Sequence, residues 1–312
     1  MDLFAIPGDT GKPFRRKVVQ TLLRSGDYID GATDYCMLVP YANKADLSTE
    51  ERVWLAYLYG LSYSCTTAIR MFEALSEPQH LRGSQVKKFW GSEKPTLYFN
   101  PDRKYIKNND QVALALKSVK TDLGDSSLLS RVLEVSQEGQ SFDGLYRYIQ
   151  KSWKFFGPHG SYLFFDALYG LCPEVYVDPT HLDWKHCGKT VPEGMAHMLY
   201  QDELIQTHTF PFAVYDRMVD KLQQTTGQPK VLIESVLCAF RKFFKGTRYV
   251  GYYADRMLEE CLFVDSLRGV HSKPDVWGLR KASVPKELRG EDQGWDGIRK
   301  DQTKRWLERG EP

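Results

Sequence analysis

One stretch of the chain, Trp153–Trp184, most constrains the fold, because helix-forming and helix-breaking residues alternate within it. Two glycines and a proline in the segment Gly157–Gly160 predict a tight Gly-Pro-His-Gly turn. An apolar helical segment follows, interrupted by Asp166, and two later prolines end that helix and extend the chain. The stretch therefore predicts two helices joined by a glycine turn. Such a turn either presents backbone N–H groups to a phosphate or only reverses the chain direction.

Composition limits the class of protein. The chain has 312 residues, of which 42% are hydrophobic, enough for a sizeable core in one large domain or two small ones. Its 42 basic and 40 acidic residues nearly cancel, which excludes a histone-like polycation but not a local basic groove. The six cysteines include no CxxC pair, so neither a disulfide framework nor an iron–sulfur cluster is expected. With no signal peptide and no run of 18 apolar residues, a cytoplasmic protein without a membrane partner is expected.

Helical spacing of apolar residues recurs along the chain and predicts a mainly α fold. The predicted helices cover Lys12–Arg24, a segment beginning at the capping box Ser48–Glu51, residues 108–121 and 126–137, Phe142–Phe155, a segment beginning at the capping box Thr190–Glu193, Phe212–Thr226, Lys230–Phe244, and a segment beginning at Tyr252. The basic residues Arg15, Arg16 and Lys17 are expected on a solvated face. We expect a helical catalytic domain over 1–265, single or divided into two subdomains around a cleft, and a polar basic extension over 266–312.

Basic and aromatic residues are interleaved over residues 82–107, a pattern that suits nucleic acid because cations meet phosphates and rings stack on unpaired bases. The segment Asp102–Gln111 concentrates charge where a helix begins, a placement that favours anions. Within it Arg103, Lys104 and Lys107 are candidate ligands for phosphate, and Arg103 has the planar fork that binds two oxygens at once. Lysines that cover apolar surface would give the same pattern.

Three polar residues lie four apart in the predicted helix Lys230–Phe244 and therefore share one stripe: Glu234, Cys238 and Lys242. A carboxylate, a thiol and an amine on one face could serve as general base, nucleophile and anion clamp. A surface ion-pair stripe beside a small buried cysteine would look the same. A further group, made of His181, His186, Cys187 and His197, fits no zinc-ligand spacing, so no metal site is expected.

The order of several segments resembles the phage amino acid:DNA transferase family, which is grouped with the α-glutamyl/putrescinyl thymine pyrophosphorylases. The segments are LSTEERVWLAYLYG, NPDRKYIKNNDQ, FFGPHGSYLFFDALYG, HLDWKHCGK and ESVLCAFRKFFKGTRYVGYYADRMLEE. Together they span roughly residues 47–262. The resemblance implies a helical, DNA-glycosylase-like architecture with a helix–hairpin–helix. In that architecture Gly157 to Gly160 would form the hairpin and Asp178 would be the catalytic aspartate. The hairpin here is GPHG rather than the tighter Gly-x-Gly, and Asp183 competes with Asp178 for the role.

The resemblance also implies a reaction on DNA in the cytoplasm of a phage-infected host. The substrate would be 5-hydroxymethyluracil activated as a pyrophosphate ester, and an amino acid such as glycine would replace the pyrophosphate through its amine. The implied partners are DNA and a free amino acid. No cofactor is expected, although a divalent ion carried by the pyrophosphate is compatible with the reaction. The alternatives are a glycosylase-like base hydrolase and a non-catalytic helical DNA-binding phage protein.

Residues can be assigned to the steps of this reaction. Leaving pyrophosphate requires cations, and the attacking amine requires a general base. The candidates for binding pyrophosphate or DNA are Arg103, Lys104, Lys107, Gly157, Gly160, Lys242 and Arg248. The candidate bases are Asp178, Asp183 and Glu234, and Cys238 is a candidate nucleophile whose thiolate would add to C6 of the base, with Lys242 lowering the thiol pKa. The target base would flip out of the duplex and stack on Phe156, Trp184 or Tyr253.

Overall fold

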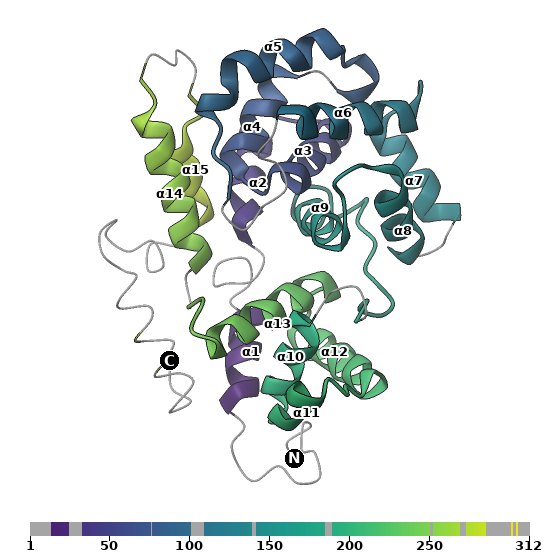
Figure 1. The fold of residues 1–312 in the computed structure, drawn as a ribbon, viewed down its shortest axis with the longest axis vertical. Coiled ribbons are helices and arrows are strands. Elements are labelled where there is room, and N and C mark those ends of the chain that lie inside the picture. Colours follow the sequence, from purple (N-terminus) through teal and green to yellow (C-terminus); the bar gives the residue numbers. More distant parts are fainter. Residues whose placement is uncertain are drawn as a thin grey trace. The chain divides into compact units, whose positions relative to one another are not determined.

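The computed structural model describes residues 14–24, 33–75, 77–100, 109–138, 142–184, 189–249, 252–268 and 273–284, together with residues 301 and 304. Every regular element in these ranges is a helix and none is a strand, which confirms the predicted mainly α fold class (Figure 1). The helix–hairpin–helix resemblance to DNA glycosylases stays a prediction. Over the same ranges, no helix combines the length and apolar character that a membrane crossing requires.

The chain divides into two compact units, each assembled from separate segments. Unit 1 contains residues 1–31, 182–252 and 291–312, and unit 2 contains residues 32–181 and 253–290. Residues on both sides of position 265 therefore belong to unit 2. The predicted division into a catalytic domain and a C-terminal extension stays a prediction.

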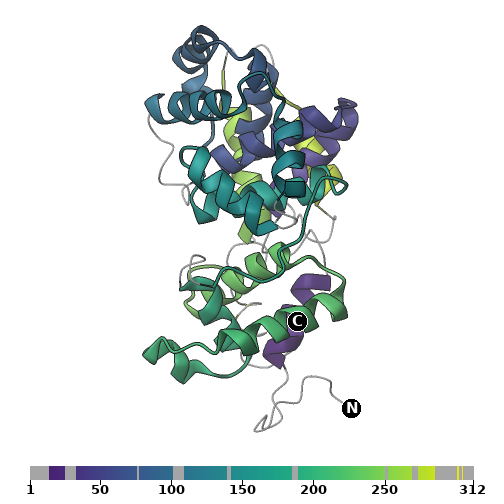
Figure 2. The same ribbon diagram turned by 90° about the vertical axis from the view of Figure 1, so that its right-hand side faces the viewer.

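Unit 1 is a helical cluster around one central helix, α13. Its helices are α1 (Phe14–Arg24), α10 (Thr190–Met198), α11 (Asp202–Thr207), α12 (Phe212–Thr226) and α13 (Lys230–Phe244). Helix α1 packs against α10, α12 and α13, and both views show this purple helix among the green ones (Figures 1 and 2). Val19, Leu22 and Leu23 of α1 are completely or almost completely buried in this cluster. Burial of this apolar face explains why a short basic helix docks here.

Helices α10 and α13 cross closely in unit 1 because of Gly194. A Cβ atom at this position would overlap the main-chain carbonyl of Leu237 on α13. Next to it, Glu193 of α10 accepts a 2.5 Å hydrogen bond from Nε of Arg241 and lies 3.5 Å from Nζ of Lys245. Burial alone would raise the pKa of Glu193, but the two cations outweigh it and the pKa lies below its usual value. The carboxylate thus stays charged within the helix interface.

The predicted capping box at Thr190–Glu193 is wrong, because the glutamate binds α13 instead. Helix α10 begins at Thr190, and its N-cap residue Lys189 makes no side-chain capping hydrogen bond. The capping box predicted at Ser48–Glu51 is confirmed: Ser48 N donates to Glu51 Oε2 at 2.8 Å, and Glu51 N donates to Ser48 Oγ at 3.4 Å. At Glu193, cations of the neighbouring helix thus compete with the cap for the carboxylate.

Arg15 and Arg16 of α1 are also placed differently from the prediction, whereas the Lys17 side chain lies outside the described part of the structure. Arg16 is only 4% exposed. The guanidinium of Arg15 lies over the rings of Tyr200 and Phe244, 4.3 Å and 4.6 Å from their centroids, and bonds Asp202 at 3.0 Å. Its planar charged group therefore contributes packing as well as charge to unit 1.

Unit 2 holds the remaining elements. Its α-helices are α2 (Leu38–Lys44), α3 (Thr49–Ser62), α4 (Cys65–Ala74), α5 (Gly83–Glu93), α6 (Asn109–Leu123), α7 (Leu128–Glu138), α8 (Phe142–Ser152), α9 (Pro158–Leu171), α14 (Tyr252–Ser266, except its first residue) and α15 (Val276–Ser283). Short 3-10 turns, η2 (Thr33–Met37), η3 (Pro78–His80) and η4 (Lys94–Thr96), join some of them. Figure 1 shows the central pair, α3 and α9, among the others.

The centre of unit 2 is the crossing of α3 and α9 at Gly60. A Cβ atom here would lie 3.1 Å from Phe164 Cβ and 3.2 Å from the carbonyl oxygen of Gly160. Helix α3 continues past Gly60 to Ser62, so this glycine permits a close helix approach and does not end the helix. Tyr57 on α3 stacks on Phe156, with ring centroids 4.9 Å apart, and completes an aromatic layer beside the crossing.

The turn before α9 is displaced from its predicted position. Helix α9 begins at Pro158, and Gly157 is its N-cap residue with an extended backbone. Residues 153–157 connect α8 to α9, with Phe155 at φ +69°. Gly160 lies inside the helix and is buried. The prediction that Gly157–Gly160 itself forms the turn is therefore wrong, because proline suits the first helical position, where its missing N–H costs nothing.

A buried carboxylate joins α14 to the start of α4 within unit 2. Glu260 is 4% exposed, and its Oε2 accepts hydrogen bonds from Ser64 Oγ at 2.9 Å, Thr66 N at 3.0 Å and Thr66 Oγ1 at 2.8 Å. Burial raises the pKa of Glu260 to about 7, although these donors lower it in part. The group therefore titrates near neutral pH.

Candidate active site

The family-implied catalytic aspartate, Asp178, follows α9 in an extended segment of unit 2. Its Oδ1 accepts a 2.6 Å hydrogen bond from the hydroxyl of Tyr176. The Tyr176 ring meets Tyr169 of α9 edge to face, with centroids 5.2 Å apart. Burial raises the pKa of Tyr176, and the carboxylate of Asp178 raises it further, so the hydroxyl stays protonated and keeps donating. One carboxylate oxygen is thereby held in a defined direction.

A second carboxylate acts on the same tyrosine. Asp166 of α9 is only 4% exposed, and its charge also raises the pKa of Tyr176. Two aspartates from separate segments of unit 2 thus both raise the pKa of the Tyr176 hydroxyl. The sequence analysis named Asp166 only as an interruption of an apolar helix. That interruption was itself the signal, because an acid inside a buried apolar helix is costly unless it has a specific role.

The competing aspartate, Asp183, belongs to unit 1. It is partly exposed and precedes Trp184, whose indole Nε1 donates to Asp216 Oδ1 at 2.7 Å. Trp184 stacks on Phe212 with centroids 6.0 Å apart and an interplanar angle of 6°. The two candidate aspartates therefore lie in different units.

The three residues predicted to stack on a flipped base are all buried within their own units. Phe156 is 1% exposed, and Trp184 and Tyr253 are each 6% exposed. Aromatic neighbours cover Phe156 and Trp184, namely Tyr57 and Phe212. Stacking on a flipped base would require these rings to become exposed, and their assignment to that role stays a prediction. Large aromatic residues bury so much apolar area that core packing competes strongly with a surface role.

The stripe on α13 comes together in unit 1 as predicted. Charges on Lys242, Glu234 and Arg248 all act on the Cys238 thiol, and Lys242 also hydrogen bonds it. Burial nevertheless dominates and raises the pKa of Cys238 above its usual value. Lys242 does lower the pKa of the thiol, as predicted, but burial outweighs this effect and the net shift is upward. Glu234 is 9% exposed, and the group as a whole offers a carboxylate beside cations.

The remaining residues predicted to bind pyrophosphate or DNA lie partly outside the described structure. Arg103, Lys104 and Lys107 lie outside the described residues. Gly157 has open space around it, whereas the backbone of Gly160 serves the α3–α9 crossing. Their assignment to pyrophosphate or DNA stays a prediction.

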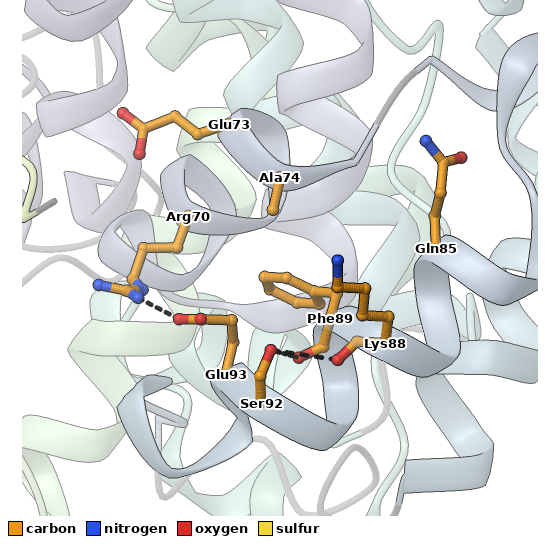
Figure 3. A pocket seen from close by; sticks show the side chains of 8 residues that line it. All are labelled: Arg70, Glu73, Ala74, Gln85, Lys88, Phe89, Ser92 and Glu93. Carbon is orange, nitrogen blue, oxygen red and sulfur yellow. Dashed lines mark hydrogen bonds and ion pairs between the residues drawn. The ribbon is translucent and has the colours of Figure 1, made fainter. Parts of the chain in front are cut away.

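The sequence analysis missed a pocket in unit 2. Residues of α4 and α5 line a cavity of about 470 Å³ (Figure 3). The lining side chains are Arg70, Glu73, Ala74, Gln85, Lys88, Phe89, Ser92 and Glu93. The interleaved basic and aromatic residues from position 82 onward were the signal nearest to this pocket, but the two helices that build it meet only in the folded chain.

Within the described ranges, no three His, Cys, Asp or Glu side chains lie close enough together to hold a metal ion, and His186 and Cys187 fall outside those ranges.

The fold and these side chains define a mainly α-helical protein that carries the carboxylates and cations of acid–base and anion-binding chemistry. The family model described as amino acid:DNA transferase matches residues 34–249, more than half of the chain. The chain therefore belongs to the amino acid:DNA transferase family, as the sequence resemblance indicated. It is an enzyme that transfers an amino acid to DNA. No curated protein and no solved structure matches the chain.

Proposed function

We propose that this enzyme replaces the pyrophosphate of 5-pyrophosphoryloxymethyluracil in DNA by an amino acid, such as glycine, joined through its amine. The observation that carries the proposal is the family match over residues 34–249. The reaction belongs to thymine hypermodification of phage DNA in the host cytoplasm. The target base flips out of the duplex, because a base inside the stack cannot reach a protein site.

The chemical step is a substitution at the exocyclic methylene carbon. The amine nitrogen forms a bond to that carbon, the carbon–oxygen bond breaks, and pyrophosphate leaves with the electron pair. The surplus proton on nitrogen passes to a carboxylate base. We assign Asp178 as this base because the resemblance points to it and the Tyr176 hydroxyl, 2.6 Å away, holds its carboxylate in a defined direction. Asp183 and Glu234 are the alternatives.

Cations stabilise the leaving pyrophosphate in this scheme. Lys242 and Arg248 of unit 1 already act together on Cys238, which supports a shared positive region around α13. Arg103, Lys104 and Lys107 complete the proposed set, and the backbone at Gly157 and Gly160 is assigned to DNA or pyrophosphate. A divalent ion bound to the pyrophosphate would supply further positive charge.

The test is nucleoside mass analysis of DNA carrying the activated base after incubation with the protein and a mixture of amino acids. A new nucleoside with the mass of an aminoacyl-methyl uracil, formed together with pyrophosphate, is expected and identifies the amine. Abasic sites would indicate a base hydrolase instead, and unchanged DNA with binding intact would contradict the proposed substrate.

The assignment of the base is tested in the same assay. Asp178→Asn should lower the rate about 100-fold or more, because a positioned general base contributes roughly that much. Asp183→Asn is the matched control in the other unit. Its rate should stay within about 3-fold of wild type, because a carboxylate that does not accept the proton contributes little to the rate. The reverse order of the two variants would transfer the role to Asp183.

A further inference from the structure

The pocket between α4 and α5 is lined by equal numbers of positive and negative side chains. Two cations, Arg70 and Lys88, and two carboxylates, Glu73 and Glu93, line the same 470 Å³ cavity in unit 2. In Figure 3 Arg70 and Glu93 meet at one end of the pocket and Gln85 lies at the other. The volume lies within the usual range for small-molecule sites. Such an arrangement selects among ligands by their charge pattern.

The fixed part of the pocket is the pair formed by Arg70 and Glu93. Arg70 is 7% exposed and donates from Nη2 to Glu93 Oε2. Its planar guanidinium carries five N–H donors, enough for it to bind Glu93 and a ligand carboxylate together. Glu93 in turn is positioned by the Thr96 hydroxyl, which donates to the same Oε2 at 3.1 Å.

The rest of the lining supplies an apolar wall and an exposed charged rim. Phe89 is 6% exposed and lies beside Ala74. Glu73 and Lys88 are exposed at the rim. The Ser92 hydroxyl donates to the carbonyl oxygens of Lys88 and Phe89 at 3.1 Å and 3.3 Å, so the polar contacts left for a ligand are mainly charged (Figure 3).

The charge pattern decides the class of ligand. Two carboxylates in the lining repel a phosphate or pyrophosphate, and an uncharged ligand would gain no ion pair from the four charged side chains. A zwitterion pairs with both signs: its carboxylate meets Arg70 and Lys88, and its ammonium meets Glu73 and Glu93. We infer that this pocket binds the free amino acid substrate. The inference rests on the proposed function and names the site for one of its two substrates.

Binding of glycine to the full-length protein without DNA tests the inference, with acetate and methylamine as probes that each keep one charged end. Glycine should bind at least about 10-fold more tightly than either half-ligand, because both charged ends contribute. Glu73→Gln and Lys88→Gln, which change exposed residues, should each raise the Kd for glycine about 3- to 10-fold. Lys87→Gln, on the same helix but outside the lining, should change it less than about 2-fold.

Arg70 needs a paired variant, because its removal alone leaves a partly buried Glu93 without its partner. The double variant Arg70→Met/Glu93→Gln removes both charges, and its thermal unfolding shows whether it is folded. A folded double variant should no longer bind glycine. In the DNA transfer assay Glu73→Gln and Lys88→Gln should raise the KM for glycine and leave kcat nearly unchanged.

Two outcomes separate this inference from the proposed reaction. If wild type forms the modified nucleoside while the Kd and KM for glycine are the same in every pocket variant, the pocket assignment is wrong and the reaction stands. If no modified nucleoside forms but glycine binds and the pocket variants weaken it, the pocket assignment stands and the activated base is wrong. Equal binding of glycine, acetate and methylamine would also overturn the pocket assignment.

Discussion

At the scale of single residues, Glu260 gives the protein a built-in response to pH. Its carboxyl is buried with three hydrogen-bond donors, and burial raises its pKa from 4.5 to about 7. Because the folded state holds this proton more tightly than the unfolded state, its contribution to stability is complete below pH 4.5 and is lost as pH rises through about 7.

Glu260→Gln should remove this pH dependence. The amide oxygen still accepts from Ser64 and Thr66, but the side chain cannot ionise. Relative to wild type, the variant should gain stability between pH 5 and pH 8, by up to roughly 3 kcal/mol at the upper end. Urea unfolding across that range measures the difference. A constant difference at every pH would show that Glu260 does not titrate in this window.

Cys238 is expected to be dispensable for transfer. Burial raises the pKa of its thiol in spite of Lys242, so little thiolate is present at neutral pH. Cys238→Ser should therefore keep its kcat within about 3-fold of wild type in the nucleoside assay, because the thiol supplies no covalent step. Cys261→Ser, a buried cysteine of unit 2, controls for loss of packing. A loss of activity in Cys238→Ser alone would restore the nucleophile hypothesis.

At the scale of elements, two glycines set the distances between helices. Gly60 brings α3 against α9, and Gly194 brings α10 against α13. A packed interior cannot accept even one extra methyl group at such a crossing without moving a helix.

Gly194→Ala should destabilise unit 1 by about 1–3 kcal/mol, because the new methyl overlaps the Leu237 carbonyl. Gly91→Ala is the matched control: it lies inside α5 with nothing within 4 Å of the added methyl, and it should stabilise the protein by about 0.5–1 kcal/mol. Thermal unfolding of both variants measures the contrast. Equal shifts in the two variants would rule out steric control at Gly194.

Helices were the part of the fold that the sequence predicted well. Phe212–Thr226 and Lys230–Phe244 match α12 and α13 at both ends, because apolar periodicity and the glycine and proline between them are local signals. The prediction of a turn at Gly157–Gly160 was wrong because proline can begin a helix as well as break one. The prediction that Arg15 lies on a solvated face failed because its partners, Tyr200 and Phe244, lie about 200 residues further along the chain.

The candidate site was predicted unevenly for the same reason. The stripe of Glu234, Cys238 and Lys242 was readable because four-residue spacing alone places side chains on one helical face. The sign of the Cys238 pKa was not readable, because burial depends on neighbouring elements. The hydrogen bond between Tyr176 and Asp178 was also not predicted, although only one residue separates them in the sequence. Such a bond depends on local backbone geometry, which a sequence pattern does not determine.

At the scale of the whole molecule, the matched family region covers neither folded unit completely. It ends at residue 249 and begins at residue 34. Helix α1 supplies buried leucines to unit 1, and α14 and α15 supply Glu260 and the buried Val276 and Leu279 to unit 2. Both units therefore depend on residues outside the match.

A chain trimmed to residues 34–249 should consequently unfold at a lower temperature than the full chain, or aggregate. The expected loss is several kcal/mol, since each buried leucine or similar residue contributes about 2–5 kcal/mol relative to alanine. Thermal unfolding with size-exclusion chromatography measures it. Leu23→Asp in the full-length protein tests the role of α1 without shortening the chain. If the trimmed chain melted at the temperature of the full chain, the outer helices would be unimportant for stability.

The docking of α1 onto α13 also sets an order of events during synthesis. The residues of α1 leave the ribosome more than 200 residues before Phe244, the last residue of its partner helix. At about 5–20 residues per second, translation of that interval takes roughly 10–45 s. Until α10, the first of its partner helices, has been made, the apolar face of α1 has no native surface to cover it. The nascent chain must therefore carry this apolar segment uncovered while residues 32–181 of unit 2 are being made.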